Sequence, residues 1–132
     1  MNLRALIVDD EEFARKNLIM LLQEFCPAIE VVGEADSKEA AKELIDQLNP
    51  SVLFLDIRMP SGVEGFELLD ELNHQNIIVV FVTAFKDFAI RAFNANAAYY
   101  LLKPIDIDEL TTAVDRVVAS LKLFSDEPEQ FK

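Results

Sequence analysis

The sequence predicts an α/β fold, a three-layer sandwich in which a doubly wound sheet of five parallel strands lies between two layers of helices. Two observations lead to this prediction. Short apolar runs alternate with amphipathic segments five times along the chain, which is the pattern of consecutive strand–helix units. The runs are apolar almost throughout, as expected of parallel strands that are covered on both faces. Right-handed crossovers leave few topologies for such units, and we expect the strand order 2-1-3-4-5.

The first half of the chain contains three of the predicted strands and two helices. The first helix carries apolar residues at spacings of three and four, and Pro27 ends it. Ser37 is placed to cap the second helix, which ends before Pro50. The third strand is a short apolar run that meets Asp56. In chain order, these elements are predicted at residues 3–8, 11–25, 29–35, 38–48 and 52–55.

The second half of the chain adds three helices and two strands. A loop that contains Pro60 and Gly62 leads into the third helix. Pro104 precedes the last helix, and Asp106 and Asp108 lie in its first turn, where the helix dipole favours negative charge. In chain order, these elements are predicted at residues 65–72, 77–82, 87–94, 99–102 and 106–123.

The composition indicates one cytoplasmic domain. The 132 residues are 52% apolar, which is enough for a hydrophobic core, and no window approaches the ~20 apolar residues of a membrane span. No signal peptide is visible. The net charge of −12 opposes direct binding to nucleic acid or to an anionic membrane. Cys26 is the only cysteine, so no disulfide can form within the chain. We expect an excised domain over residues 1–124, with the polar residues 125–132 beginning a linker.

Polar side chains follow four of the predicted strands, at the ends where sheets of this kind bind ligands. They are Asp9, Asp10, Asp56, Thr83 and Lys103. In the order 2-1-3-4-5 the first and third strands are neighbours, so the three carboxylates repel one another unless a cation lies among them. Hard oxygen ligands suit Mg²⁺. A carboxylate nucleophile beside Mg²⁺, a lysine and a hydroxyl group predicts phosphoryl transfer onto aspartate.

Each of these residues also has a plain structural interpretation. An aspartate after a strand often forms a turn or caps a helix. Thr83 could simply enter the next helix, and Lys103 alone would be interpreted as a solvated loop residue. Asp56 is harder to explain in this way because its strand is so apolar. The combination of five suitable residue types at one edge of the sheet favours phosphoryl transfer.

The combined motifs resemble the receiver domain of two-component response regulators, the CheY-like family, whose fold is flavodoxin-like. The resemblance rests on "ALIVDDEE", "LFLDIRMP", "VTAF" and "YYLLKP", and it covers nearly the whole chain. It implies that Asp56 is the phosphoacceptor for a sensor histidine kinase. It also implies a Mg²⁺ site in which Asp10 is a direct ligand, Asp9 acts mostly through water, and the backbone carbonyl of Arg58 completes the protein ligands.

The resemblance further implies how the signal leaves the site. Thr83 and Lys103 would contact the phosphoryl group, and Tyr100 matches the aromatic switch residue that turns inward when Thr83 shifts. The surface of the fourth helix, fifth strand and fifth helix would then change. The Lys103–Pro104 bond is cis in the family. Such a domain is not an enzyme in the usual sense, because it catalyses only its own phosphorylation and dephosphorylation.

The segment "VTAFKDFAIRAFNANAAYYLLKPI" is most similar to the LytR/AlgR class of receivers. That class usually precedes a DNA-binding domain of the LytTR type. The resemblance therefore implies that DNA is bound only through a downstream domain absent from this sequence. A phosphorylation-dependent homodimer is left open.

Two further expectations concern the loop after the phosphoacceptor and the packing of aromatic residues. The family usually places a glycine eight residues after the phosphoacceptor, whereas Gly65 follows Asp56 by nine. The loop is thus one residue longer, which leaves its route into the third helix open but not the chemistry of the site. The phenylalanines expected to be core or half-buried packing residues, and not a cofactor site, are Phe13, Phe25, Phe54, Phe66, Phe88 and Phe93.

Three alternative functions fit the sequence less well than the receiver interpretation. A Mg²⁺-dependent phosphohydrolase with an aspartate nucleophile usually has a second aspartate two residues on, where this chain has Arg58. A flavin-binding module needs a first loop that cradles phosphate, and "DDEEF" would repel one. A receiver-like interaction module that is not regulated by phosphorylation tends to lose the aspartate or the lysine, but this chain keeps Asp56 and Lys103.

Overall fold

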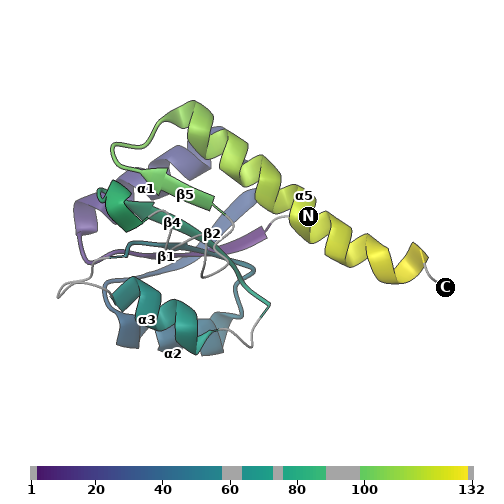
Figure 1. Cartoon of the computed structure of the whole chain (residues 1–132), viewed down its shortest axis with the longest axis horizontal. Helices are drawn as coiled ribbons and strands as arrows, with labels where there is room; N and C mark the ends of the chain where they lie inside the picture. The colour runs from purple at the N-terminus through teal and green to yellow at the C-terminus, as the bar shows by residue number, and fades with distance from the viewer. Residues whose placement is uncertain (1–2, 58–63, 73–75, 89–98, 131–132) are drawn as a thin grey trace.

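Five parallel strands form one sheet in the order β2-β1-β3-β4-β5, which confirms the predicted fold class and strand order (Figure 1). This computed structural model describes residues 3–57, 64–72, 76–88 and 99–130, with side chains as far as residue 121. The strands are β1 (Leu3–Val8), β2 (Ile29–Ala35), β3 (Val52–Leu55), β4 (Ile78–Thr83) and β5 (Tyr99–Leu102). The helices are α1 (Glu12–Phe25), α2 (Lys38–Leu48), α3 (Glu64–Glu71), the 3₁₀ turn η1 (Lys86–Phe88) and α5 (Ile107–Gln130).

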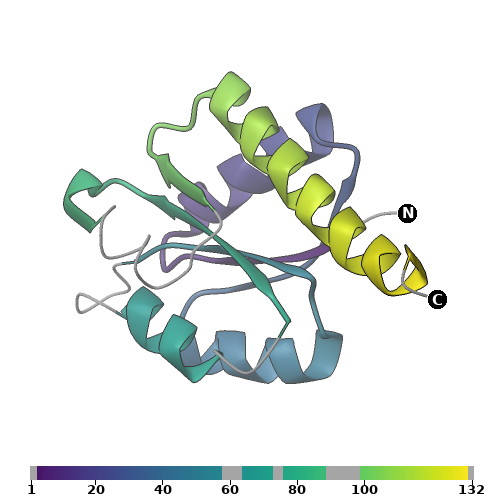
Figure 2. The ribbon, with the colours of Figure 1, turned by 45° about the vertical axis from the view of Figure 1, so that its right-hand side comes forward.

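The sheet separates two helical layers, each with its own hydrophobic core (Figures 1 and 2). Helices α1 and α5 cover one face, and α2 and α3 cover the other. Neighbouring residues of a strand point to opposite faces, so Leu53 lies in the α2–α3 core and Phe54 in the α1–α5 core. Full burial of one such side chain contributes about 1.5–3 kcal/mol. This burial on both faces is the reason that β3, whose four residues are all buried, is apolar throughout.

Local signals fix both ends of α2. The hydroxyl of Ser37 accepts a hydrogen bond from the amide N–H of Ala40 at 3.1 Å, which confirms it as the N-cap. Asn49 closes the helix with a φ of 48°, in the left-handed region that asparagine tolerates better than most residues. Pro50 follows and cannot continue the helix.

The register of the strands brings the polar residues of the sequence motifs to one edge of the sheet. Val8 lies opposite Leu55, and the amide N–H of Asp56 donates to the carbonyl of Val8 at 2.9 Å. The amide N–H of Lys103 donates to the carbonyl of Thr83 at 2.8 Å. The residues that end β1, β3, β4 and β5 are therefore neighbours at the carboxyl edge, where ligands bind in such sheets.

Several elements end at different residues than predicted. Strand β4 (Ile78–Thr83) begins and ends one residue later, so Thr83 belongs to the strand and not to the following loop. Helix α5 continues past the predicted end at 123 and extends beyond the sheet (Figure 1). Only the start of the predicted helix 87–94 lies among the described residues, where it is the 3₁₀ turn η1. The boundary of the domain at residue 124 stays a prediction.

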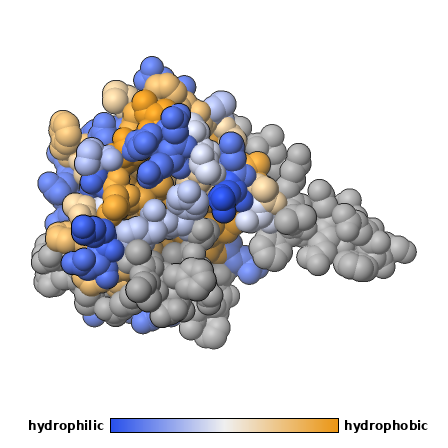
Figure 3. All heavy atoms as spheres, turned by 45° about the horizontal axis from the view of Figure 1, so that its top comes forward, coloured by the Kyte–Doolittle hydropathy of each residue, from blue (hydrophilic) through white to orange (hydrophobic). Residues whose placement is uncertain are grey.

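The expected packing was wrong for Phe13, whose side chain is 85% exposed. Successive helical residues are about 100° apart, so Phe13 lies about 140° around α1 from buried Leu18. The prediction was also wrong for Phe25, the last residue of α1, which is exposed at 40%. Polar and apolar side chains are interspersed on the face shown in Figure 3. No helix in the described ranges has the length and apolar character needed to cross a membrane. The phenylalanines that are buried or half-buried as expected are Phe54, Phe66 and Phe88, and Phe93 lies outside the described residues.

Candidate functional site

Lys103 joins the ends of β1 and β3 at the carboxyl edge of the sheet. Its Nζ lies 2.6 Å from Oδ2 of Asp9 and 3.3 Å from Oδ2 of Asp56. The two carboxylate side chains are 7% and 8% exposed, and the lysine side chain is 21% exposed. Charge-assisted hydrogen bonds of this kind are among the strong ones in proteins. The structure thus brings three of the predicted site residues together around one positive charge.

Asp9 has a hydrogen-bond partner at each of its polar atoms. Its amide N–H donates to the carbonyl of Ala35 at 3.0 Å, and its own carbonyl accepts from Nη1 of Arg15 at 2.9 Å. Its Oδ1 accepts from the amide N–H of Glu11 at 3.0 Å, and its Oδ2 accepts from Lys103. The loop between β1 and α1 is therefore fixed relative to the end of β2 and to Lys103 at the end of β5.

Asp10 and Glu11 extend the acidic site toward solvent. One carboxylate oxygen from each of Asp9, Asp10 and Glu11 lies within 4.8 Å of the others. Asp9 is buried, whereas the other two residues are exposed. A cluster of carboxylate oxygens that is open to water fits the ligand preference of Mg²⁺. Asp56 is not part of this group and is linked to Asp9 through Lys103. We did not predict Glu11 as a ligand from the sequence, although it directly follows the two aspartates.

Burial has the largest effect on the protonation of these groups. Burial raises the pKa of Asp56 above its ordinary value, although the charge of Lys103 and a hydrogen bond with the Thr83 side chain act in the opposite direction. Burial lowers the pKa of Lys103, but its hydrogen bond with Asp9 and the negative charges of Asp56 and Asp9 outweigh burial, so this pKa is raised. Burial and the charge of Asp9 raise the pKa of Asp10. A site with more carboxylates than cations attracts a further cation.

Gly65 lets the start of α3 approach the backbone that carries Asp56. Its amide N–H donates to the carbonyl of Ile57 at 2.8 Å. A Cβ at Gly65 would lie 2.5 Å from the carbonyl oxygen of Asp56 and 2.6 Å from the Cα of Ile57, so a side chain would force the backbones apart. The loop at 58–63, whose route the sequence leaves open, lies outside the described residues, and so does the predicted carbonyl ligand Arg58.

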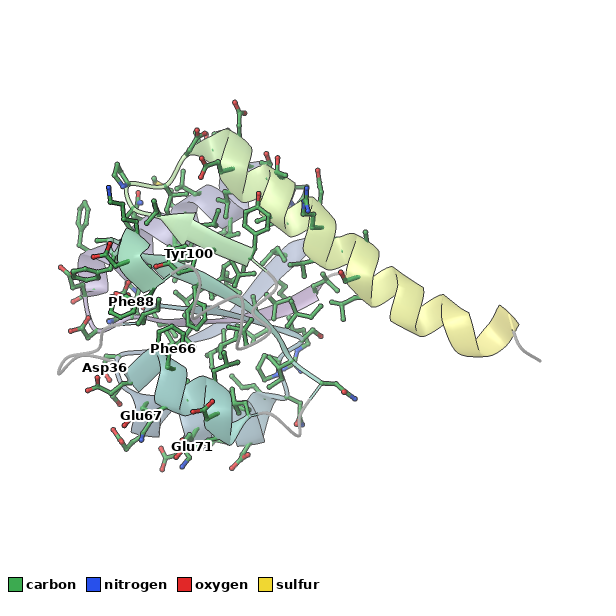
Figure 4. All side chains as sticks on the ribbon, viewed as in Figure 1. Asp36, Phe66, Glu67, Glu71, Phe88 and Tyr100 are labelled. Atoms are coloured by element: carbon green, nitrogen blue, oxygen red, sulfur yellow. The ribbon has the colours of Figure 1, made fainter. Side chains whose placement is uncertain are left out.

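Thr83 and Tyr100 are connected through the backbone of Phe85. The Oγ1 of Thr83 accepts from the amide N–H of Phe85 at 3.4 Å, and the hydroxyl of Tyr100 donates to the carbonyl of Phe85. Tyr100 is labelled on β5 in Figure 4. The ring of Tyr100 packs against Phe81, with ring centroids 6.3 Å apart. Burial raises the pKa of the Tyr100 hydroxyl. The roles of Thr83 and Tyr100 stay predictions, but the backbone of one residue, Phe85, contacts both side chains. The Lys103–Pro104 bond is cis, as the resemblance implies.

An ion-pair cluster that the sequence did not reveal lies next to the acidic loop, which consists of Asp9, Asp10 and Glu11. Nε of Arg15 lies 2.8 Å from Oε1 of Glu34, and Nζ of Lys16 lies 2.6 Å from Oε2 of Glu34. Hydrogen bonds with Lys16 and Arg15 lower the pKa of Glu34. The basic residues belong to α1 and the glutamate to β2, and no spacing in the sequence connects them.

Comparisons with known proteins agree with this geometry. A model of the response regulator receiver domain matches residues 5–115. The chain is 46% identical over 121 residues to a response regulatory protein of Vibrio cholerae serotype O1, a match that covers 91% of this chain and 50% of the relative. It is 46% identical over 117 residues to the transcriptional regulatory protein BtsR of Escherichia coli strain K12, covering 87% of this chain and 48% of BtsR.

A solved structure gives the same result for the fold. The REC domain of AraT, a response regulator from Geobacillus stearothermophilus, aligns with a TM-score of 0.82 at 30% sequence identity. The alignment covers 95% of this chain and 99% of that one. By contrast, the chain spans about half the length of the curated relatives it matches.

Proposed function

The chain belongs to the family of response regulator receiver domains, and we propose that it accepts a phosphoryl group from a sensor histidine kinase on Asp56. The observation that carries this proposal is the bridge that Lys103 makes between Asp56 and Asp9. Asp56 offers a buried carboxylate at the end of an apolar strand, and the ammonium group of Lys103 lies 3.3 Å from it. A nucleophile beside a fixed positive charge is the arrangement that phosphoryl transfer requires.

The proposed reaction is a displacement at phosphorus. A carboxylate oxygen of Asp56 forms the new bond to phosphorus, the bond between phosphorus and the donor breaks, and the donor leaves with the electron pair. Lys103 offsets negative charge on the transferring group, and the hydroxyl of Thr83 donates a hydrogen bond to it. Water that attacks the phosphorus atom later releases Asp56. The domain thereby catalyses only its own phosphorylation and dephosphorylation.

Asp9, Asp10 and Asp56 fit a Mg²⁺ site, and the family resemblance adds the backbone carbonyl of Arg58. Their ligand atoms are all oxygens, and the exposure of Asp10 leaves room for the waters that Mg²⁺ retains. Oδ2 of Asp9 is bonded to Lys103, so Asp10 is the carboxylate best placed for direct binding, and Asp9 would act mostly through water. When bound, Mg²⁺ supplies positive charge beside the transferring group.

We further propose that the whole protein is a cytoplasmic transcription regulator of the LytR/AlgR class, in which this domain controls a LytTR-type DNA-binding domain. The segment from Val82 to Ile105 resembles that class. The relative BtsR is named a transcriptional regulatory protein, and this chain spans about half of its length. Phosphorylation would act on the surface of β5 and α5 through Thr83 and Tyr100, with a homodimer as one form of output.

Intact mass after incubation with acetyl phosphate tests the proposal. The wild-type chain should gain the mass of one phosphoryl group when Mg²⁺ is present and should gain little when Mg²⁺ is chelated. Asp56→Asn should gain none. Asp46→Asn, the same change at an exposed position of α2, is the matched control and should behave as the wild type. Equal modification of Asp56→Asn and the control would contradict the assignment.

A further inference from the structure

Arg15 of α1 contacts both the acidic loop and strand β2. Nη1 of its guanidinium group donates to the carbonyl of Asp9 at 2.9 Å, and its Nε donates to Oε1 of Glu34 at 2.8 Å. The side chain is only 14% exposed. The carbonyl of Asp9 belongs to the peptide unit that connects Asp9 to Asp10. Arg15 therefore holds the piece of backbone that links the two aspartates.

We propose that Arg15 is a positioning residue for the cation site, holding Asp9 and Asp10 in the orientation that binds Mg²⁺. The inference rests on the proposed function, because it concerns the same site. Glu34 has a supporting part, since its bond to Nε directs the guanidinium plane and leaves Nη1 aimed at the carbonyl of Asp9. Only the planar, forked guanidinium group can reach both acceptors in this way, and the single ammonium group of lysine cannot.

The direction of the change in Mg²⁺ affinity distinguishes a positioning role for Arg15 from a purely electrostatic one. Arg15 is positively charged and lies beside the acidic loop, so its charge alone repels a divalent cation. Removing that charge would strengthen Mg²⁺ binding if the residue acted only through its field. A weaker affinity for Mg²⁺ after removal can therefore come only from a change in the geometry of the loop.

Lys16 provides a matched control on the same helix. It contacts the same Glu34 at 2.6 Å and carries the same charge, but it is 58% exposed and its hydrogen bond goes to Glu34 and not to the acidic loop. Lys16→Met should leave the dissociation constant for Mg²⁺ within about twofold of the wild type or lower it slightly, because exposed charges act weakly.

The experiment is a Mg²⁺ titration of the unphosphorylated chain, followed by amide chemical shifts in NMR spectra, for wild type, Arg15→Met, Arg15→Lys and Lys16→Met. Both Arg15 variants should raise the dissociation constant about tenfold or more and shift the amide signals of Asp10 and Glu11 before Mg²⁺ is added. The lysine variant should not rescue binding although it keeps the charge.

The outcomes distinguish the two proposals. If Arg15→Met or Arg15→Lys binds Mg²⁺ as tightly as Lys16→Met does, the inference is overturned while the proposed function stands. If Arg15→Met does not fold, as judged by its amide spectrum, Arg15→Lys decides by the same criterion. If the wild type itself binds no Mg²⁺, the proposed cation site fails and the inference fails with it.

Discussion

Replacing Lys103 with methionine should destabilise the domain in the absence of metal ions by about 3–5 kcal/mol. Methionine keeps most of the length of the side chain, so the change removes mainly the charge. At an effective dielectric constant of about 20, a unit charge at 2.6 Å from Asp9 gains about 6 kcal/mol, and one at 3.3 Å from Asp56 gains about 5 kcal/mol. The cost of removing a largely buried lysine from water offsets much of this attraction. The net loss of stability should therefore be the ~3–5 kcal/mol that is typical when one partner of a buried ion pair is removed.

Mg²⁺ should return a large part of this stability, because a divalent cation compensates the same carboxylates. Lys103 no longer competes for Oδ2 of Asp9 in the variant, so the variant should also bind Mg²⁺ more tightly than the wild type. A ligand present at 100 times its dissociation constant stabilises a fold by about 2.7 kcal/mol. Unfolding in urea, followed by far-ultraviolet circular dichroism at pH 7 with EDTA or with excess Mg²⁺, measures both effects.

Lys16→Met is the matched control for this prediction. It removes a lysine that lies 2.6 Å from Glu34 but is 58% exposed, so we expect a loss within about 1 kcal/mol and no recovery in Mg²⁺. The reasoning would be refuted by a loss in Lys103→Met that is no larger than in the control. It would also be refuted by a loss of the same size in EDTA and in Mg²⁺, because Lys103 would then not act by compensating the carboxylates.

Three other predictions follow from the same geometry. Asp10→Ala should raise the dissociation constant for Mg²⁺ about tenfold or more, or about 1.4 kcal/mol, and a titration that overlays the wild type would contradict it. Burial raises the pKa of Asp56, so the folded state keeps this proton to higher pH than the unfolded state, and stability falls as the pH rises from the ordinary aspartate value through the raised one. Asp56→Asn should therefore be more stable than the wild type at pH 7 in EDTA, and urea unfolding should show that gain vanish below the ordinary value. Thr83→Ala leaves Asp56 in place, so the domain should still be phosphorylated, but it removes the side-chain acceptor of the Phe85 amide. The change in the NMR signals of Tyr100 on adding beryllofluoride should therefore become smaller than in the wild type. A change as large as in the wild type would show that the Thr83 hydroxyl does not transmit the signal to Tyr100.

The strands and the meeting of their ends were predictable because each rests on a local pattern. A strand buried on both faces must be apolar at every position, as Leu53 and Phe54 are, and parallel strands must bring their carboxyl ends to one edge. Asp9, Asp56 and Lys103 are far apart in the sequence, yet the strand order alone is enough to place them at the same edge of the sheet.

Other features depend on distances that a sequence pattern does not contain. The contact of Arg15 with Glu34 and with the carbonyl of Asp9 depends on how α1 lies against the end of β2. Phe13 is apolar, but it is exposed because it lies on the side of α1 that faces away from the core. Glycine is needed at Gly65 because the backbone there lies against the backbone of Asp56 and Ile57. The number of residues between Asp56 and Gly65 could not predict this contact.

The most direct test of the central claim is to locate the phosphoryl group on the chain. After incubation with acetyl phosphate and Mg²⁺, borohydride reduction converts a phosphorylated aspartate to homoserine, and tandem mass spectrometry of the peptides then identifies its position. We predict conversion at Asp56, the buried carboxylate that Lys103 contacts at 3.3 Å. Conversion at Asp9 or Asp10 with Asp56 unchanged would contradict the account, because the nucleophile would then be a residue assigned to the cation site.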